Sequence, residues 1–369
     1  MKYSVQTTLR KRSLFLFNPV FLLAFISFVF SVSAAYGQVR QDVMVAHFID
    51  VGQADATLLE FPCGAILIDA GAQGDTEEKK LVKYLKDFFT GRPDLHNTLD
   101  LVIVTHAHLD HNVALDNVAN NFTIKRYIDN GLRAGSGRVN QKWLQDNAAE
   151  KDITYASYSY NKIKSDGDEQ GFTDEIIDPL ECTDADPEIH LLSGAFTTKP
   201  AGWAATAFSN GNNHSVVIKV KFGKASFLFT GDLETAGIET LLKTYPAATL
   251  DVDVLRVGHH GAANATTPEF LSATTPSYAV ISCGKWYYGR TSGGNFTTYA
   301  YGHPRINILD QLDSAIDGER TVPIKIKGGV KSKVFKTYTV KKNIYATAWD
   351  KTFKAEAHAD GTIEMVLDQ

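Results

Sequence analysis

Short apolar runs separated by turn residues make up the part of the chain that follows residue 40. The runs contain β-branched or aromatic residues and are bounded by Gly, Pro or Asp, which is typical of strands. The runs predict strands at 42–51, 56–61, 65–69 and 100–104. Between the last two runs, Leu81, Leu85 and Phe88/Phe89 recur at helical spacing and predict a helix over 76–90. The first three strands are expected to form an antiparallel meander.

The remainder of the chain continues the mixture of strands and helices. Further strands are predicted at 124–129, 216–220, 225–232, 251–257 and 277–283, and helices at 113–120, 234–244 and 306–312. The tail is rich in strand patterns, at 321–326, 334–340, 344–349, 352–358 and 362–366. Residues 131–205 show no clear period. We interpret them as an insertion over the functional site, with a surface excursion that does not reach substrate as the alternative.

The N-terminus has the order of a secretory signal. Lys2, Arg10, Lys11 and Arg12 precede an apolar run at 20–30, and small residues follow up to Gly37. We therefore expect residues 1–37 to be a signal peptide that is removed, leaving 38–369, with a retained membrane anchor as the alternative. No transmembrane segment is expected after residue 37.

Charge and cysteine content narrow the classes of protein further. The formal charge is −5, and removal of residues 1–37 leaves 37 − 4 = 33 basic against 42 acidic residues, or −9. An acidic surface does not attract phosphate backbones as a whole, which weakens a nucleic-acid substrate without excluding it. Cys63, Cys182 and Cys283 are too few for a disulfide framework. One pair could bridge in an oxidising compartment, and the sequence does not say which.

A cluster of side chains that can bind metal follows the strand predicted at 100–104. Here His106, His108, Asp110 and His111 fall within six residues. His106 and His108 are two residues apart, so on an extended segment they point to the same side and can share one ion. Asp110 and His111 follow the bend and can reach a second ion. Imidazole and carboxylate ligands suit zinc, and also manganese or iron.

This stretch resembles the signature of the metallo-β-lactamase superfamily. Further segments, in the family's order, make the chain similar to the hydrolase domain of ComEC/Rec2 competence proteins. They are Phe48–Ala56, Leu67–Gly71, Phe229–Asp232, Val257–Gly261 and Tyr301–Pro304. The resemblance implies the α+β class and a four-layer αβ/βα sandwich, in which 321–369 are C-terminal strands of the same domain. The membrane channel of competence proteins is not expected.

The same resemblance implies a ligand set for two divalent metal ions, zinc first and manganese as the alternative. The implied ligands are His106, His108 and Asn212 for the first ion, Asp110, His111 and His259 for the second, and Asp232 bridging both. Asn212 and Ser215 match the N-x-x-S pattern of this branch, and His214 remains an alternative third ligand. His260 is expected to contact substrate if His259 binds metal. Asp69 is expected to orient the histidine loop, with a helix cap as the alternative.

Asp110 and His303 are the residues predicted to act in catalysis. His303 lies in the Y-G-H-P turn outside the ligand set, where it could donate a proton or bind phosphate. An exposed turn histidine is the alternative. The aromatic stretch at 285–299 could stack on a base or a sugar, or could serve only for packing.

The function expected from this resemblance is a secreted or periplasmic bacterial hydrolase. Two ions would lower the pKa of a bridging water, and the resulting hydroxide would attack the substrate. The preferred substrate is a phosphodiester, within a small molecule, nucleotide or nucleic acid, and no obligate protein partner is inferred. Hydrolysis of a lactone, a β-lactam or another ester or amide is the first alternative. A secreted binding protein without catalytic activity is the second.

Overall fold

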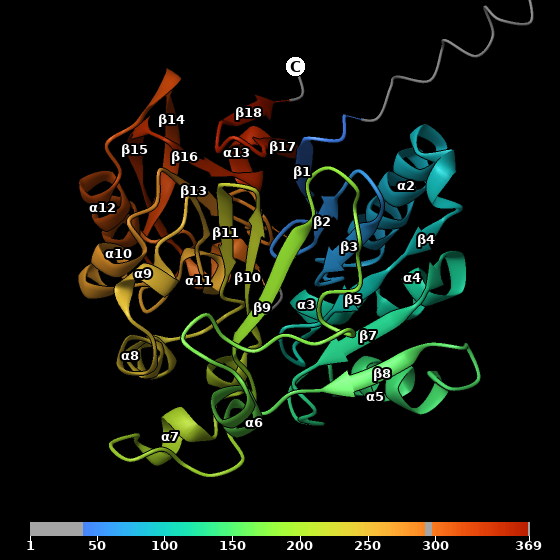
Figure 1. Ribbon diagram of the computed structural model, residues 1–369. Helices are drawn as coiled ribbons and strands as arrows, with labels where there is room; N and C mark the ends of the chain where they lie inside the picture. The colour runs from blue at the N-terminus through green and yellow to red at the C-terminus, as the bar shows by residue number, and fades with distance from the viewer. Residues whose placement is uncertain (1–39, 292–296, 368–369) are drawn as a thin grey trace, which may run out of the picture. The chain divides into compact units, whose positions relative to one another are not determined.

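A computed structural model describes residues 40–291 and 297–367 of the chain (Figure 1). Two β-sheets lie against one another in this part, and helices cover their outer faces. The predicted signal peptide at 1–37 lies outside the described residues, and so does the start of the predicted domain at residue 38.

The first sheet begins with the meander that the sequence predicts. Within the described residues it has eight strands. In spatial order they are β18 (Ile363–Leu367), β17 (Phe353–His358), β1 (Val43–Phe48), β2 (Thr57–Glu60), β3 (Ala65–Ile68), β5 (Leu101–Ile103), β7 (Arg126–Asp129) and β8 (Thr154–Ser157). The strands from β18 to β3 pair antiparallel. From β3 to β8 the pairing is parallel, so β3 and β5 end at the same edge.

The second sheet has six strands among the described residues. In spatial order they are β16 (Ile344–Ala346), β13 (Tyr278–Ile281), β12 (Val254–Arg256), β11 (Ala225–Phe229), β10 (Val217–Phe222) and β9 (Pro187–Ser193). The neighbours β11, β12, β13 and β16 are parallel. Two further two-stranded sheets are separate from these: β4 (Thr98–Leu99) with β6 (Thr123–Ile124), and β14 (Glu319–Lys331) with β15 (Val334–Lys342).

Twelve helices flank the two sheets in the described part of the chain. They are α2 (Asp75–Gly91), α3 (Leu109–Asn112), α4 (Leu115–Asn121), α5 (Arg138–Asn147), α6 (Tyr160–Asp166), α7 (Ala205–Phe208), α8 (Thr235–Thr244), α9 (Ala247–Leu250), α10 (Pro268–Thr274), α11 (Thr298–Tyr301), α12 (Ile306–Ala315) and α13 (Thr347–Asp350). Helix α2 has acidic residues in its first turn, which the helix dipole favours, and a buried stripe of Leu81, Leu85 and Phe89. That stripe packs on the first sheet, whereas α8, α10 and α12 pack on the second.

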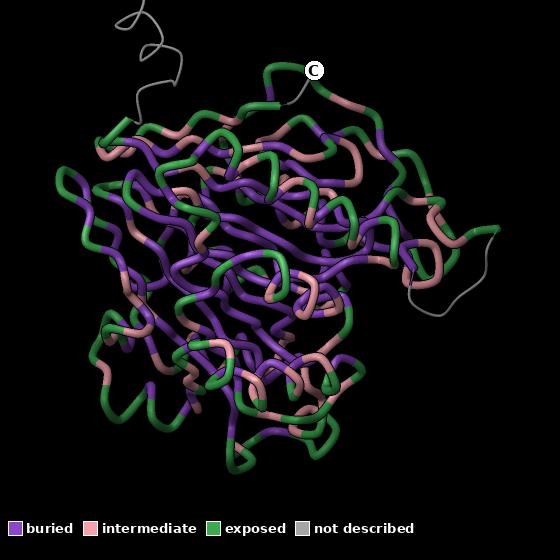
Figure 2. The backbone as a smooth tube through the Cα atoms, turned by 90° about the vertical axis from the view of Figure 1, so that its right-hand side faces the viewer, coloured by how far each residue is buried: buried purple, intermediate pink, exposed green. Residues whose placement is uncertain are grey.

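The main core fills the space between the two sheets, where Figure 2 shows long buried segments of backbone. Neighbouring residues of one strand point to opposite faces, so Leu59 enters this core while Leu58 packs under the helices of the first sheet. In the second sheet, Phe227 and Phe229 point inward and Leu228 points outward. The predicted α+β class with a four-layer αβ/βα sandwich is confirmed.

Two segments differ from the sequence prediction. Residues 131–205, predicted as an insertion, supply β8 to the edge of the first sheet and β9 to the edge of the second, so they are woven into the sandwich. The strand predicted at 344–349 stops at Ala346 and continues as α13. Of the tail, β16 joins the second sheet and β17 and β18 join the first, while β14 and β15 form a separate hairpin.

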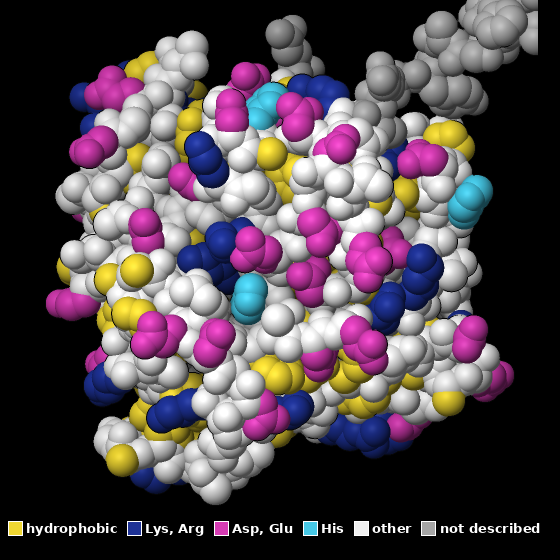
Figure 3. Space-filling model, in the orientation of Figure 1, with side chains coloured by type: hydrophobic (Ala, Val, Ile, Leu, Met, Phe, Trp, Pro, Cys, Tyr) yellow, Lys and Arg dark blue, Asp and Glu magenta, His cyan; other side chains and the backbone are white. Residues whose placement is uncertain are grey.

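Acidic side chains are spread over the face drawn in Figure 3, in keeping with the formal charge of −5. Among the described residues, no helix combines the length and the apolar character that crossing a membrane requires.

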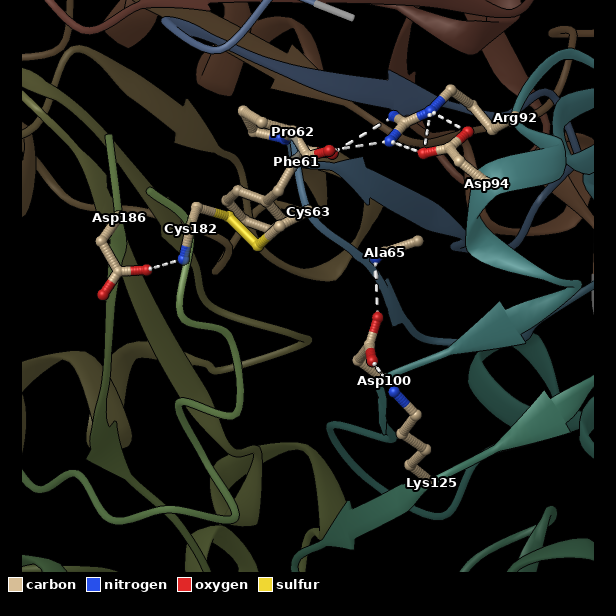
Figure 4. Close-up of a disulfide and its surroundings, with 10 residues drawn as sticks. All are labelled: Phe61, Pro62, Cys63, Ala65, Arg92, Asp94, Asp100, Lys125, Cys182 and Asp186. Carbon is tan, nitrogen blue, oxygen red and sulfur yellow. Dashed lines mark hydrogen bonds and ion pairs between the residues drawn. A yellow bond between two sulfur atoms is a disulfide. The ribbon is translucent and has the colours of Figure 1, made fainter. Parts of the chain in front are cut away.

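A disulfide joins Cys63, in the turn between β2 and β3, to Cys182, in the segment that leads to β9 (Figure 4). The turn is further held by Arg92, which donates hydrogen bonds to the carbonyl oxygens of Phe61 and Pro62 at 3.2 and 2.9 Å. On the other side, the Cys182 N–H donates to Asp186 at 2.7 Å. The disulfide therefore ties the segment that connects β8 to β9 to the β2–β3 turn of the first sheet.

Replacing both Cys63 and Cys182 with serine is expected to lower the free energy of unfolding by about 2–4 kcal/mol, because the bond closes a long loop of the unfolded chain. The two positions are 119 residues apart in sequence. Chemical denaturation with circular dichroism measures the change. The parent unfolded in a reducing buffer is the control and should match the variant. An unchanged midpoint in the variant would mean that the bond does not form in solution.

Candidate metal centre

The predicted site residues follow strands that end at the same edge of the sandwich. Asp69 follows β3, the histidine loop follows β5, Asp232 follows β11, and His259 and His260 follow β12. Parallel neighbours deliver their carboxyl ends together, so residues far apart in sequence meet there. The side chains of this set are almost fully buried, apart from those of His108 and His259, which are half-buried.

Asp69 has the orienting position that the sequence assigned to it. One carboxylate oxygen accepts the N–H of Thr105 at 2.7 Å, and the other accepts the Thr105 hydroxyl at 2.9 Å and Nδ1–H of His111 at 2.7 Å. A proton on Nδ1 of a neutral imidazole leaves the lone pair on Nε2. The carboxylate thereby turns Nε2 of His111 toward the cluster, as carboxylates beside metal-binding histidines commonly do.

Four buried side chains converge into one candidate cluster: Asp110, His111, Asp232 and His260. One ligand atom from each lies within 4.8 Å of all the others. His111 Nε2 is 3.1 Å from Asp232 Oδ1, and His260 Nε2 is 3.2 Å from Asp110 Oδ2 and 3.5 Å from Asp232 Oδ2. Asp110 Oδ1 is buried without a hydrogen-bond partner, and the buried atoms His111 Nε2 and Asp232 Oδ1 are close together without the geometry of a hydrogen bond. Buried polar atoms are rarely left so, and a divalent cation would satisfy all three.

Electrostatics at this cluster favour a positive charge. Burial works to lower the pKa of His111, but the carboxylates of Asp232 and Asp69 outweigh it and hold that pKa well above its usual range. The pKa of His260 is also raised against burial, by Asp232 and Asp110. Burial would raise the pKa of Asp232, yet the neighbouring imidazoles hold it well below its usual range. A group of atoms that stabilises an added proton in this way also stabilises a metal ion.

The geometry brings His260, rather than the predicted His259, into the cluster with Asp110, His111 and Asp232. Nδ1–H of His260 donates to the carbonyl oxygen of Ser282 at 2.7 Å, so Nε2 faces the carboxylates. His259 uses both ring nitrogens elsewhere, with Asn264 at 3.3 Å and with the Asn212 amide at 3.3 Å. Its side chain is 23% exposed and that of His260 only 2%. His259 therefore lies at the exposed side of the cluster, in the position that the sequence analysis expected for His260.

His106 and His108 form a second group beside the first. His106 Nε2 lies 3.1 Å from His108 Nδ1 and 4.0 Å from Asp232 Oδ2. Burial lowers the pKa of both rings, so both are neutral and carry a lone pair. Asp232 is thus the side chain that lies between the two groups, which is the place that a bridging carboxylate requires.

Asn212 and His214, the two alternatives for a third ligand, differ in their hydrogen bonds. His214 accepts the Phe196 N–H at 3.0 Å and donates to the carbonyl oxygen of Phe208 at 2.7 Å, so neither ring nitrogen is available. The amide nitrogen of Asn212 donates to Glu234 at 2.9 Å, while its amide oxygen is buried without a partner. Asn212 therefore fits the metal group and His214 does not.

His303 lies beside the centre, with its ring centroid 5.7 Å from that of His259 and 6.4 Å from that of His260. The turn buries it to 5% exposure, so the exposed-turn alternative does not describe it. Burial lowers the pKa of His303 well below its usual range. A neutral imidazole donates one hydrogen bond through the nitrogen that carries the proton and accepts one through the other nitrogen.

Gln53 selects which nitrogen of His303 carries the proton, a contact that the sequence did not reveal. The amide oxygen of Gln53 accepts the Gly284 N–H at 3.4 Å and the Thr298 hydroxyl at 2.8 Å. Its amide nitrogen therefore donates to His303 Nδ1, 3.1 Å away. This leaves the proton on Nε2, so His303 presents an N–H donor.

Arg256 is a second residue that the sequence analysis missed. It is fully buried on β12, donates to the carbonyl oxygen of Gly231 at 2.7 Å and forms an ion pair with Asp55. Ser215 accepts the Asp232 N–H at 3.1 Å. Both residues hold the loop that carries Asp232. An arginine within an otherwise apolar strand was the signal that could have pointed to this role.

Comparison with known proteins agrees with this architecture. The family model of the metallo-beta-lactamase superfamily matches residues 49–285. The chain belongs to the metallo-beta-lactamase superfamily. The match includes the histidine loop, Asp232 and His260.

The curated relatives confirm the resemblance to the ComEC/Rec2-like branch. ComE operon protein 3 of Bacillus subtilis is 26% identical over 301 residues, which cover 78% of this chain and 32% of that protein. Recombination protein 2 of Haemophilus influenzae is 43% identical over 75 residues, or 20% of this chain and 9% of that protein. The chain thus spans about a third of the first relative's length and less of the second's.

Among solved structures, the metallo-beta-lactamase fold protein YhfI from Bacillus subtilis is 10% identical. The match covers 64% of the present chain and 85% of the YhfI chain, with a TM-score of 0.36. Likeness at this level carries no argument about activity.

Proposed function

We propose that the protein is an exported hydrolase that uses two divalent metal ions and prefers phosphodiester substrates. The observation that carries the proposal is the buried cluster of Asp110, His111, Asp232 and His260, whose ligand atoms converge within 4.8 Å. His106, His108 and Asn212 supply the second group of ligands on the other side of Asp232. Zinc is the ion that this mixture of imidazole and carboxylate favours, with manganese as the alternative.

When bound, two such ions supply Lewis-acid activation of water and stabilise negative charge on the substrate. The chain's own residues divide the remaining work. Asp69 orients His111, Arg256 and Ser215 hold the Asp232 loop, and His303 presents an N–H beside the centre. An N–H donor at that position can bind a phosphoryl oxygen or protonate a leaving group.

The preference for phosphodiesters and the export of the protein rest on separate supports. Similarity to Recombination protein 2 of Haemophilus influenzae supports a nucleotide-containing substrate, because recombination acts on DNA. The Cys63–Cys182 disulfide supports an oxidising compartment, since such bonds are rare in the cytosol. A secreted or periplasmic location agrees with the signal pattern at the N-terminus.

A substrate panel tests the proposal. The metal-stripped protein, with zinc or manganese added back, is assayed on a phosphodiester, a lactone and a β-lactam. We expect the phosphodiester to be hydrolysed with the highest kcat/KM, and chelation to stop it. Preference for the lactone or the β-lactam would place the protein among the other hydrolases of its fold. No turnover of any substrate by protein that binds both ions would favour the binding-protein alternative.

A further inference from the structure

A groove runs from His303 along the β14–β15 hairpin. The loop at 284–287 forms one wall and the hairpin forms the other, and the cavity has a volume of about 390 Å³. Its lining is Gly284, Lys285, Trp286, Tyr287, His303, Pro304, Lys325, Ile326, Lys327, Thr337, Ala348 and Trp349. A volume of this size lies in the range of sites that hold small molecules or one unit of a polymer.

Strand alternation places the lysines of the hairpin on the groove side. Ile326 is buried in the core that lies between the second sheet and its helices. Its neighbours Lys325 and Lys327 therefore point to the opposite face of the strand, and both are exposed. Lys327 is paired with Thr337, whose side chain shares its face. Phe335 lies two residues from Thr337 on the same strand, and its ring packs 5.8 Å from that of Trp286 in the opposite wall.

The groove is strongly positive for a protein of formal charge −5. Its lining holds Lys285, Lys325 and Lys327 and no carboxylate. The wider segment at 319–342 has one acidic residue, Glu319, against eight basic ones. Of these, Lys325 and Lys327 line the groove, whereas Arg320 is buried against Asp350 and Lys336 points to the opposite face of the hairpin. Local charge of this kind attracts an anionic ligand, although the protein as a whole does not.

Aromatic rings are interleaved with these charges. Tyr287 is 51% exposed, and the centroid of its ring lies 5.7 Å from that of Trp286, with the two rings at right angles. Arg290 lies over the face of Trp286 at 5.7 Å. Lysines that follow a groove beside aromatic faces are the combination by which proteins hold unpaired nucleotides.

The hairpin is bound directly to the turn that carries His303. The Gly329 N–H donates to the carbonyl oxygen of Pro304 at 2.8 Å. A Cβ at Gly329 would lie 1.8 Å from the carbonyl oxygen of Gly302, so only glycine allows the two segments to approach this closely. The positions of Lys325 and Lys327 relative to His303 are therefore set by backbone contacts.

We propose that this groove binds a single-stranded polynucleotide on one side of the cleaved bond, with Lys325 and Lys327 on phosphates and the rings of Trp286 and Tyr287 on a base. This assignment rests on the phosphodiesterase function proposed above. A double-stranded polynucleotide fits less well because its bases are already stacked on one another and cannot lie on the rings.

Binding is measured by fluorescence anisotropy with a labelled single-stranded oligonucleotide and the purified protein in EDTA, where no hydrolysis occurs. Lys325→Ala/Lys327→Ala should weaken binding roughly tenfold and reduce the slope of log affinity against log salt by about 1.4, since each phosphate contact on a single strand contributes about 0.7. Trp286→Ala should weaken binding by about 5- to 100-fold with an unchanged salt slope, and Trp286→Phe should restore most of it.

Lys336→Ala is the matched control. Lys336 is exposed on the same hairpin and is paired with Gly328. This pair is next to the pair of Lys327 and Thr337, and successive pairs point to opposite faces, so Lys336 points away from the groove. Its removal takes away the same charge and should leave binding close to that of the parent. Equal binding by Lys325→Ala/Lys327→Ala and the parent would overturn the proposal, and so would equal affinity for a duplex.

Hydrolysis of the same oligonucleotide separates this inference from the proposed function. In the double lysine variant we expect a higher KM with the parent's dependence on metal. If the parent binds the strand through the groove but cleaves nothing, the groove stands and the hydrolase function fails. If all variants cleave the strand with the parent's KM, the hydrolase function stands and the groove assignment fails.

Discussion

Replacing Asp232 with alanine is expected to remove most of the bound metal and to abolish turnover. Its carboxylate is 1% exposed and lies between the two groups of ligands, 3.1 Å from His111 and 4.0 Å from His106. Without this negative charge, two cations placed close together would repel each other across a buried space. Loss of a residue that only orients a ligand costs about 10–100-fold in metal affinity or activity, and a shared ligand should cost at least that.

Metal content by mass spectrometry and turnover of a phosphodiester measure both effects. Asp232→Asn, which keeps the shape of the side chain, should behave like the alanine variant because the charge is lost. Glu239→Ala removes one exposed acidic group from α8, the helix that follows Asp232, and should leave metal and turnover unchanged. An Asp232→Ala variant that retains two ions would show that this carboxylate bridges nothing.

Replacing His303 with alanine should leave the metals in place and lower the rate. The ring is not among the clustered ligand atoms, and its Nδ1 is held by Gln53 at 3.1 Å. If its Nε2–H serves the leaving group or a phosphoryl oxygen, its loss should reduce kcat by about 10²–10⁴-fold, the usual effect of a positioned acid. Steady-state kinetics on substrates with alkoxide and nitrophenolate leaving groups measure this, and the loss should be smaller with nitrophenolate.

Gln53→Leu provides the matched test of how His303 is held. The substitution removes the donor to His303 Nδ1 and leaves the metal ligands in place, so it should lower kcat, as His303→Ala does. In the Gln53→Leu/His303→Ala double variant, kcat should be little lower than in His303→Ala alone. Should His303→Ala match the parent on every substrate, the histidine would serve only to pack the turn.

The positions of the candidate metal-binding loops could be predicted from the sequence because the physical signal is local. A buried apolar run followed within three residues by His or Asp, as after Val104 and Phe229, marks a strand end that carries chemistry. The layered fold followed from the resemblance, since the order of strands within a sheet depends on contacts that no local pattern records. The separate β14–β15 hairpin was missed for the same reason.

The finer choices at the site depended on hydrogen bonds between distant residues. His259 and His260 are neighbours in sequence, and both have left-handed backbone, with φ of 47° and 53°. Only the acceptor at Ser282 shows which ring faces the carboxylates. His214 is a better metal ligand than Asn212 by residue type, yet Phe196 and Phe208 occupy both of its nitrogens. The pairing of Cys63 with Cys182 likewise required the fold.

Native mass spectrometry of the metal-stripped protein, titrated with zinc while turnover of bis(p-nitrophenyl) phosphate is recorded, tests the proposed binuclear centre most directly. We predict two zinc ions per chain at saturation, with turnover rising as the second ion binds. Saturation at one ion, or turnover that is complete before the second ion binds, would contradict the account.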